Sequence, residues 1–119
     1  MKIKIFDSEL KVMEVLWEKG GTTAGHIVKI LRDQTGWNPN TTYTVIKKLI
    51  EKNAIERCEP GFNCRALVAK EEIQQYEAEE LLGKLFNNSA EVFLSAFLNG
   101  KQLSGEEINR LKQLVENLK

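Results

Sequence analysis

The first half of the chain carries two apolar stripes at helical spacing. One runs from residue 10 to residue 17, and the other, from residue 24 to residue 31, follows the pattern i, i+3, i+4, i+7. Such stripes are typical of helices that bury one face. A glycine pair follows the first stripe and a single glycine follows the second, as is common where helices end. We therefore predict two helices, the first capped by Asp7 or Ser8 and the second by one of the two threonines before it.

A third helix follows, and its polar face is rich in hydroxyl groups. Asn38 is a good N-cap, and Pro39 falls at the first helical position, where its missing N–H costs nothing. An apolar stripe between Val45 and Ile50 forms the inner side. The remaining face carries Asn40, Thr41, Tyr43, Thr44, Lys47 and Lys48. Because threonine and tyrosine are not favoured helix formers, we expect this face to contact another molecule.

The spacing of apolar residues then changes from helical to extended. Residues 54–57 and 63–68 are short segments that can form strands, and the Pro-Gly pair between them is typical of a turn. Three helices followed by a β-hairpin is the order of a winged helix-turn-helix, whose third helix lies in the major groove of DNA. We therefore predict a mainly α fold with a small β-hairpin, the winged-helix DNA-binding domain spanning residues 1–71.

That order of elements gives the polar face a chemical interpretation. Threonine hydroxyls and lysine ammonium groups suit phosphates or base edges, and a tyrosine ring can press on a thymine methyl group. We assign DNA contacts to Asn40, Thr41, Tyr43, Thr44, Lys47 and Lys48 on the third helix and to Arg57, Phe62 and Arg65 on the hairpin. The alternative is a face that only contacts water, which is the usual state of polar residues opposite an apolar stripe.

After Lys70 the chain is helical again, in three short segments. Ser89 or Asn88 can cap the middle one, and Ser104-x-x-Glu107 is a capping box for the last. Their apolar surface is too large to remain in water, so these helices pack either on the first domain or against a partner. A dimer is the simpler solution, and we predict a helical dimerisation domain over residues 72–119 and a homodimer. We expect the dimer contacts at Leu82, Phe86, Phe93, Phe97, Leu98, Ile108, Leu111, Leu114 and Val115.

Composition narrows the function further. The net charge is zero, but residues 1–69 carry 11 Lys and Arg against 8 Asp and Glu, whereas residues 70–119 carry 6 against 9. The basic first half is consistent with an anionic partner. No run of about 18 apolar residues predicts membrane insertion, and the N-terminus lacks the apolar core of a signal peptide. We therefore expect a cytoplasmic protein.

Catalytic and metal chemistry find little support in the sequence. His26 is the only histidine, and the spacing of Cys58 and Cys64 is not that of a zinc site. In a reducing cytoplasm the two cysteines, which flank the predicted wing turn, should be free thiols. A nucleophile–base pair and a phosphate-binding loop are both missing. We predict a protein that is not an enzyme and needs no cofactor.

Several segments together resemble the penicillinase-repressor family, the BlaI and MecI group of bacterial transcriptional repressors. They are DSELKVMEVLWEKG, TTAGHIVKIL, WNPNTTYTVIKKLIEKNAI and FLNGKQLSGEEINRLKQLVE, and the resemblance covers nearly the whole chain. It implies a homodimer with an N-terminal winged helix and a C-terminal helical dimerisation domain. It further implies repression from a palindromic, inverted-repeat operator of antibiotic-resistance-type genes such as those for β-lactamases.

The resemblance also implies a mode of regulation. In the best-known members, a membrane sensor with a metalloprotease domain detects a β-lactam, and the repressor is cut between an asparagine and a phenylalanine. The matching bond here is Ala96–Phe97, so alanine replaces the asparagine.

The wing also departs from the family's pattern, because Phe62 stands after the wing glycine, where the family usually has a basic residue. A neutral net charge and this wing tip favour one alternative, a winged-helix module that binds proteins without reading DNA.

Overall fold

The computed structural model describes residues 3–118 and divides the chain into two compact units, Met1–Glu77 and Ala78–Lys119. Helix α4 begins in the first unit and ends in the second. The elements are α1 (Asp7–Lys19), β1 (Thr22–Thr23), α2 (Ala24–Thr35), α3 (Pro39–Glu51), β2 (Ile55–Cys58), β3 (Asn63–Ala66), α4 (Lys70–Leu85), α5 (Ala90–Asn99) and α6 (Gly105–Glu116).

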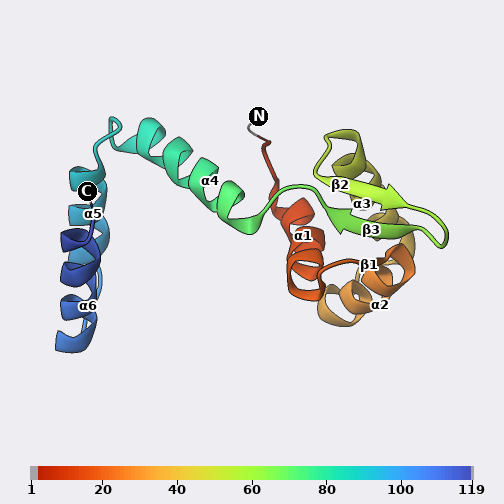
Figure 1. Ribbon diagram of the computed structural model, residues 1–119, viewed down its shortest axis with the longest axis horizontal. Coiled ribbons are helices and arrows are strands. Elements are labelled where there is room, and N and C mark those ends of the chain that lie inside the picture. Colours follow the sequence, from red (N-terminus) through yellow and green to blue (C-terminus); the bar gives the residue numbers. More distant parts are fainter. Residues whose placement is uncertain (1–2, 119) are drawn as a thin grey trace. The chain divides into compact units, whose positions relative to one another are not determined.

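The first unit is a winged helix-turn-helix, as the sequence predicts. Helices α1, α2 and α3 gather beside a small antiparallel sheet with the strand order β1-β3-β2 (Figure 1). The hairpin register pairs Ile55 with Ala66 and Arg57 with Cys64. Strand β1 was not predicted, because two residues are too few to show an alternating pattern; it pairs with β3 through Thr22 and Cys64.

The helix ends follow the predicted capping residues with one correction. The Thr23 and Asn38 side chains accept hydrogen bonds at the starts of α2 and α3, and Gly36 ends α2 in the left-handed region with φ 78°. The N-cap of α1, however, is Phe6 rather than Asp7 or Ser8. The Glu9 carboxylate reaches back to accept the Phe6 N–H at 2.9 Å, so the helix is closed without a polar side chain at the cap.

The core of the first unit joins one face of each helix to the sheet. Its largest fully buried side chains are Met13, Leu16, Ile27, Leu31, Ile46, Leu49 and Ile55. The Trp17 Nε1–H donates to the Val68 carbonyl at 2.9 Å, which fixes the chain as it leaves β3. Ile73 of α4 also packs into this core. The compact first unit runs to Glu77, and the domain boundary at residue 71 stays a prediction.

The second unit consists of the end of α4, α5 and α6. Of residues 78–118, none is buried, although capping proceeds as predicted. Ser89 caps α5, and Ser104 and Glu107 form the capping box of α6. No helix in the described part of the chain is long and apolar enough to cross a membrane.

One buried polar group in α3 has an energetic consequence. The Thr42 side chain is 0% exposed, and its hydroxyl has no hydrogen-bond partner among residues 3–118. An unpaired buried polar group costs about 1–3 kcal/mol. We predict that Thr42→Val, which keeps the shape and removes the hydroxyl, raises the free energy of unfolding by about 1 kcal/mol. Urea denaturation of the purified protein would measure the change.

The matched control is Thr44→Val, which alters an exposed hydroxyl on the same helix. Its effect should stay within about 0.5 kcal/mol, as is usual for surface substitutions. A loss of stability in Thr42→Val would contradict the prediction, because it would mean that the hydroxyl is satisfied in solution.

Candidate nucleic-acid interface

Helix α3 separates its residues cleanly into a buried and an exposed set. Thr42, Val45, Ile46 and Leu49 are buried against α1 and α2. All six polar positions predicted from the sequence are exposed: Asn40, Thr41, Tyr43, Thr44, Lys47 and Lys48. Burial of the apolar stripe therefore fixes which side of the helix faces outward. Six side chains with hydrogen-bonding or cationic groups are presented together on a rigid element.

The two exposed threonines already donate their hydroxyl protons within the helix. The Thr41 hydroxyl donates to the Asn38 Oδ1 at 3.2 Å, and the Thr44 hydroxyl donates to the Asn40 carbonyl at 2.8 Å. Their oxygens remain free to accept hydrogen bonds. In this arrangement they suit the amino groups of adenine or cytosine better than a phosphate, which needs a donor.

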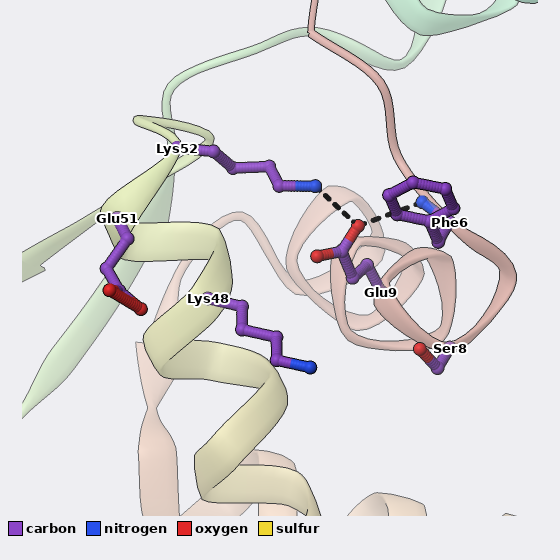
Figure 2. A pocket seen from close by; sticks show the side chains of 6 residues that line it. All are labelled: Phe6, Ser8, Glu9, Lys48, Glu51 and Lys52. Atoms are coloured by element: carbon purple, nitrogen blue, oxygen red, sulfur yellow. Dashed lines mark hydrogen bonds and ion pairs between the residues drawn. The ribbon is translucent and has the colours of Figure 1, made fainter.

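The two lysines supply the cationic part of the face. Neither Lys47 nor Lys48 forms an ion pair with another residue of the described chain. Lys48 extends toward the first turn of α1, where it lines a shallow cavity of about 510 Å³ (Figure 2). That cavity is lined by Phe6, Ser8, Glu9, Lys48, Glu51 and Lys52. Unpaired exposed ammonium groups are the kind of group that binds a phosphate backbone.

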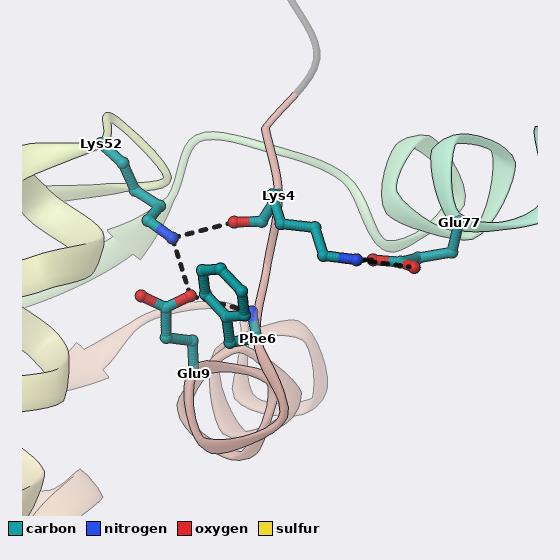
Figure 3. Close-up of polar contacts among 5 residues, drawn as sticks. All are labelled: Lys4, Phe6, Glu9, Lys52 and Glu77. Atoms are coloured by element: carbon teal, nitrogen blue, oxygen red, sulfur yellow. Dashed lines mark hydrogen bonds and ion pairs between the residues drawn. The ribbon is translucent and has the colours of Figure 1, made fainter. Parts of the chain in front are cut away.

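A third lysine, Lys52, has a structural role at the end of α3. Its Nζ donates to the Glu9 carboxylate at 2.7 Å and to the Lys4 carbonyl at 2.8 Å, and it lies 5.0 Å from the centre of the Phe6 ring. Lys4 in turn pairs with Glu77 of α4 at 3.5 Å (Figure 3). These contacts tie the end of α3 to α1 and to the N-terminal segment. Sequence reasoning missed them, because the partners are far apart in the chain.

The two wing arginines are less available than the sequence suggested. Arg57 pairs with Glu59, and Arg65 pairs with Glu56 across the hairpin. The Arg57 side chain, followed by the Phe62 N–H, lowers the pKa of Glu59, and the Glu56 carboxylate raises the pKa of Arg65. Both arginines are exposed, but each carries its own counter-charge. The cationic character of the interface therefore rests on α3.

Phe62 occupies the wing tip and contacts α3. The Arg57 guanidinium lies over its ring, 3.7 Å from the ring centre. The Tyr43 ring lies 6.0 Å away, centre to centre, with the planes inclined by 44°. Of the three hairpin residues predicted to contact DNA, Phe62 is therefore brought beside the polar face of α3. Arg65 lies on the opposite face of the hairpin, because strand residues alternate and Arg57 shares the core face with Cys64.

The residues predicted for dimerisation gather in the second unit. Phe86 and Phe93 meet edge to face at 5.2 Å, and Phe93 stacks on Phe97 at 6.0 Å. Leu98, Ile108, Leu111 and Val115 line an apolar cavity of about 380 Å³ with Leu103, Lys112 and Glu116. Leu82 is half-buried, Leu114 is exposed, and the Ala96–Phe97 bond lies inside α5 with both side chains exposed.

The chain is similar to known proteins over nearly its whole length. The family model described as penicillinase repressor matches residues 5–117. The chain belongs to the penicillinase repressor family. It is 30% identical to the penicillinase repressor of Bacillus licheniformis, over 98% of this chain and 92% of that protein. It is 25% identical to the methicillin resistance regulatory protein MecI of Staphylococcus aureus strain N315, over 94% of this chain and 93% of that one.

Two solved structures of BlaI are similar to part of this chain. The DNA-binding domain of the repressor BlaI aligns with a TM-score of 0.55 and 29% identity, covering 60% of this chain and 93% of that domain. Monomeric Bacillus licheniformis BlaI in complex with the blaP half-operator aligns with a TM-score of 0.53 and 28% identity, covering 59% and 88%. The predicted family and winged-helix fold are thus confirmed.

The wing of this protein carries two free cysteines, Cys58 on β2 and Cys64 on β3, and their thiols should differ in reactivity. Cys64 is 1% exposed, and burial raises the pKa of its thiol to about 11. At this pKa roughly one Cys64 in a thousand is ionised at pH 8. The thiolate is the reacting species, so Cys64 should react slowly. We predict that Cys58→Ser, which keeps only the Cys64 thiol, reacts with an aromatic disulfide reagent far more slowly than Cys64→Ser, which keeps only Cys58. The absorbance of the released aromatic thiol measures both rates. The register places the two sulfurs on opposite faces of the hairpin.

Unfolding in guanidinium chloride is the control, because both variants should then react equally fast. A native Cys58→Ser protein that reacts at the rate of its unfolded form would contradict the burial of Cys64.

Proposed function

We propose that this protein is a transcriptional repressor that reads DNA with the exposed face of α3 and binds an inverted-repeat operator as a homodimer. The observation that supports this most is the exposed polar and cationic face from Asn40 to Lys48, on a helix whose opposite side is buried. The family membership and the likeness to BlaI in complex with a half-operator support the same assignment. Such a protein acts where the bacterial DNA is, in the cytoplasm.

Within this proposal the residues of α3 have distinct roles. Lys47 and Lys48 contact phosphates, which contributes affinity for any sequence. Asn40, Thr41, Tyr43 and Thr44 lie nearer the start of the helix, the part that meets base edges in helix-turn-helix proteins. Arg57 and Arg65 add little, because Glu59 and Glu56 already neutralise them. The wing therefore makes a smaller electrostatic contribution than its two arginines suggest.

The second unit supports the homodimer. Ten of the thirteen large apolar side chains that are exposed in the described chain lie between Leu81 and Leu118. A monomer in water rarely keeps so much apolar surface together. A second copy would cover it and would place two α3 helices for the two halves of a palindrome. We assign the contact to the residues predicted from the sequence, including Phe97, Leu111 and Leu114.

Proteolytic inactivation at Ala96–Phe97 by a membrane sensor protease completes the proposal. The bond lies in the last turns of α5, so cleavage requires this helix to open locally. Within one protomer α5 has no buried residue, so local opening of the helix costs little free energy there. Cleavage there would divide the unit that holds the dimer together, which lowers the affinity for a two-half operator.

Lys48→Ala tests the assigned DNA-binding face. We expect affinity for every duplex to fall by a similar factor, and the slope of log affinity against log salt to become shallower by about 0.9, the value for one lost phosphate contact. Fluorescence anisotropy with a labelled duplex across a salt series measures both. Lys19→Ala, which removes an exposed lysine from the end of α1, is the control and should change neither. A flat salt response in the unmodified protein would instead favour a protein-binding module.

Leu111→Glu tests the dimer. The charge falls on the apolar side of α6, so we expect the dimer dissociation constant to rise by at least about tenfold, as for a central interface residue. Asn109→Glu adds the same charge to the polar side of the same helix and should leave the dimer intact. Sedimentation velocity distinguishes the two species. Equal dimerisation of both variants would place the interface elsewhere.

A further inference from the structure

Phe62 adopts a backbone conformation that its residue type rarely takes. Its φ is 51°, in the left-handed region that favours glycine, and it follows Gly61 with φ 86°. A bulky residue stays in that region only where surrounding contacts hold it there. At a wing tip, where the chain is otherwise exposed, those contacts are the feature to explain.

Contacts on both sides fix the Phe62 backbone. Its N–H donates to the Glu59 carboxylate at 3.2 Å, and its carbonyl accepts the N–H of Ala24, the first residue of α2, at 3.0 Å. The wing tip is therefore attached both to itself and to the start of α2. Phe62 cannot move away from α2 without losing the hydrogen bond from Ala24, and its bond to Glu59 holds the turn of the wing itself.

The Phe62 ring, held in this position, contacts both Arg57 of the wing and Tyr43 of α3. The Arg57 guanidinium lies over the ring at 3.7 Å, and Glu59 holds Arg57 through an ion pair. The same ring lies 6.0 Å from the Tyr43 ring. Glu59, Arg57, Phe62 and Tyr43 thus form one continuous set of contacts from the wing tip to the outward face of α3.

Tyr43 needs such a neighbour if it is to read a base. Its side chain is 41% exposed, and an exposed tyrosine on a helix exchanges between rotamers. Ordering a side chain on binding weakens binding, and a neighbour that orders it beforehand avoids that loss. The ring contact with Phe62 restricts Tyr43 before any DNA arrives.

The electrostatics of the wing tip point in the same direction. The Arg57 charge is already committed to Glu59 and to the Phe62 ring. A phosphate brought to this tip would meet the Glu59 carboxylate as well as the arginine. The tip is thus better suited to contact α3 than to contact a DNA backbone.

We infer that Phe62 is a positioning residue for DNA reading: it sets the direction of the Tyr43 ring, so that the wing governs sequence preference through α3 rather than by its own phosphate contact. The inference rests on the proposed function, because it requires α3 to read bases through Tyr43. It makes Phe62 a determinant of specificity that touches no DNA itself.

Selection from a random duplex pool tests this with the full-length protein and four variants: Tyr43→Ala, Phe62→Leu, the double variant and Phe62→Tyr. Phe62→Leu keeps an apolar side chain but removes the ring, whereas Phe62→Tyr keeps the ring. We expect Phe62→Leu to weaken discrimination at the same base pair as Tyr43→Ala, by roughly threefold to tenfold. The double variant should resemble Tyr43→Ala alone. Phe62→Tyr, which keeps an aromatic ring at this position, should keep the base preference of the unmodified protein.

Leu67→Ala is the matched control, because Leu67 is an exposed apolar residue just after β3, outside the proposed interface. Its base preferences should equal those of the unmodified protein. Thermal melting of each variant, compared with Leu67→Ala, checks that the hairpin remains folded.

Two outcomes overturn the inference alone. In the first, Phe62→Leu selects the same sequence with the same discrimination as the unmodified protein. In the second, it loses affinity equally for all sequences with a shallower salt slope, which would mean that the wing binds phosphate directly. Failure of the unmodified protein to select any sequence would instead reject the proposed function, and the inference with it.

The ring contact itself has a readout that needs no DNA. In the free protein, the Phe62 ring current should shift the NMR signals of the Tyr43 ring protons from their usual positions. Phe62→Leu should return them toward those positions, and Phe62→Tyr should not. Unchanged Tyr43 signals in Phe62→Leu would show that the two rings do not meet in solution and would overturn the inference.

Discussion

The burial of one stripe of α3 determines which residues of this helix face outward. Ile46 and Leu49 are 0% exposed and pack between α1 and α2, so the helix cannot rotate about its axis without exposing them. The opposite face is then held outward as a rigid array of polar and cationic groups. Even Thr42, whose hydroxyl has no partner in the described structure, is carried inside by this packing.

Two sets of contacts hold the ends of α3, and they differ in chemistry. At its C-terminal end, Lys52 joins the helix to Glu9 and to the N-terminal segment through charged hydrogen bonds. Near its N-terminal end, Tyr43 meets Phe62 of the wing through an aromatic contact. The first set fixes the position of the helix, and the second bears on the side chain that we propose to read bases. The second unit has no buried residue in 78–118, and we propose that a second copy of the chain covers its apolar surface.

The helices of this fold were predictable from the sequence, because helix formation depends mainly on residues close together in the chain. Caps such as Asn38 and Ser104, and the apolar stripes between them, depend on neighbouring residues and were predicted correctly. The features that sequence reasoning missed depend on residues far apart in the chain or on strand register. They include the pairing of Arg65 with Glu56, the ring contact of Phe62, the short strand β1 and the packing of Ile73 into the core of the first unit. Most belong to the wing, where the hairpin register decides which side chains meet.

The most direct test of the central claim is an NMR titration of the full-length, nitrogen-15-labelled protein with a duplex. We predict that the largest changes in amide signals fall on residues 40–48 of α3, with smaller changes at the wing and none of comparable size in α6. Changes concentrated in α5 and α6, or no change at a saturating concentration of duplex, would contradict the claim that the outward face of α3 reads DNA.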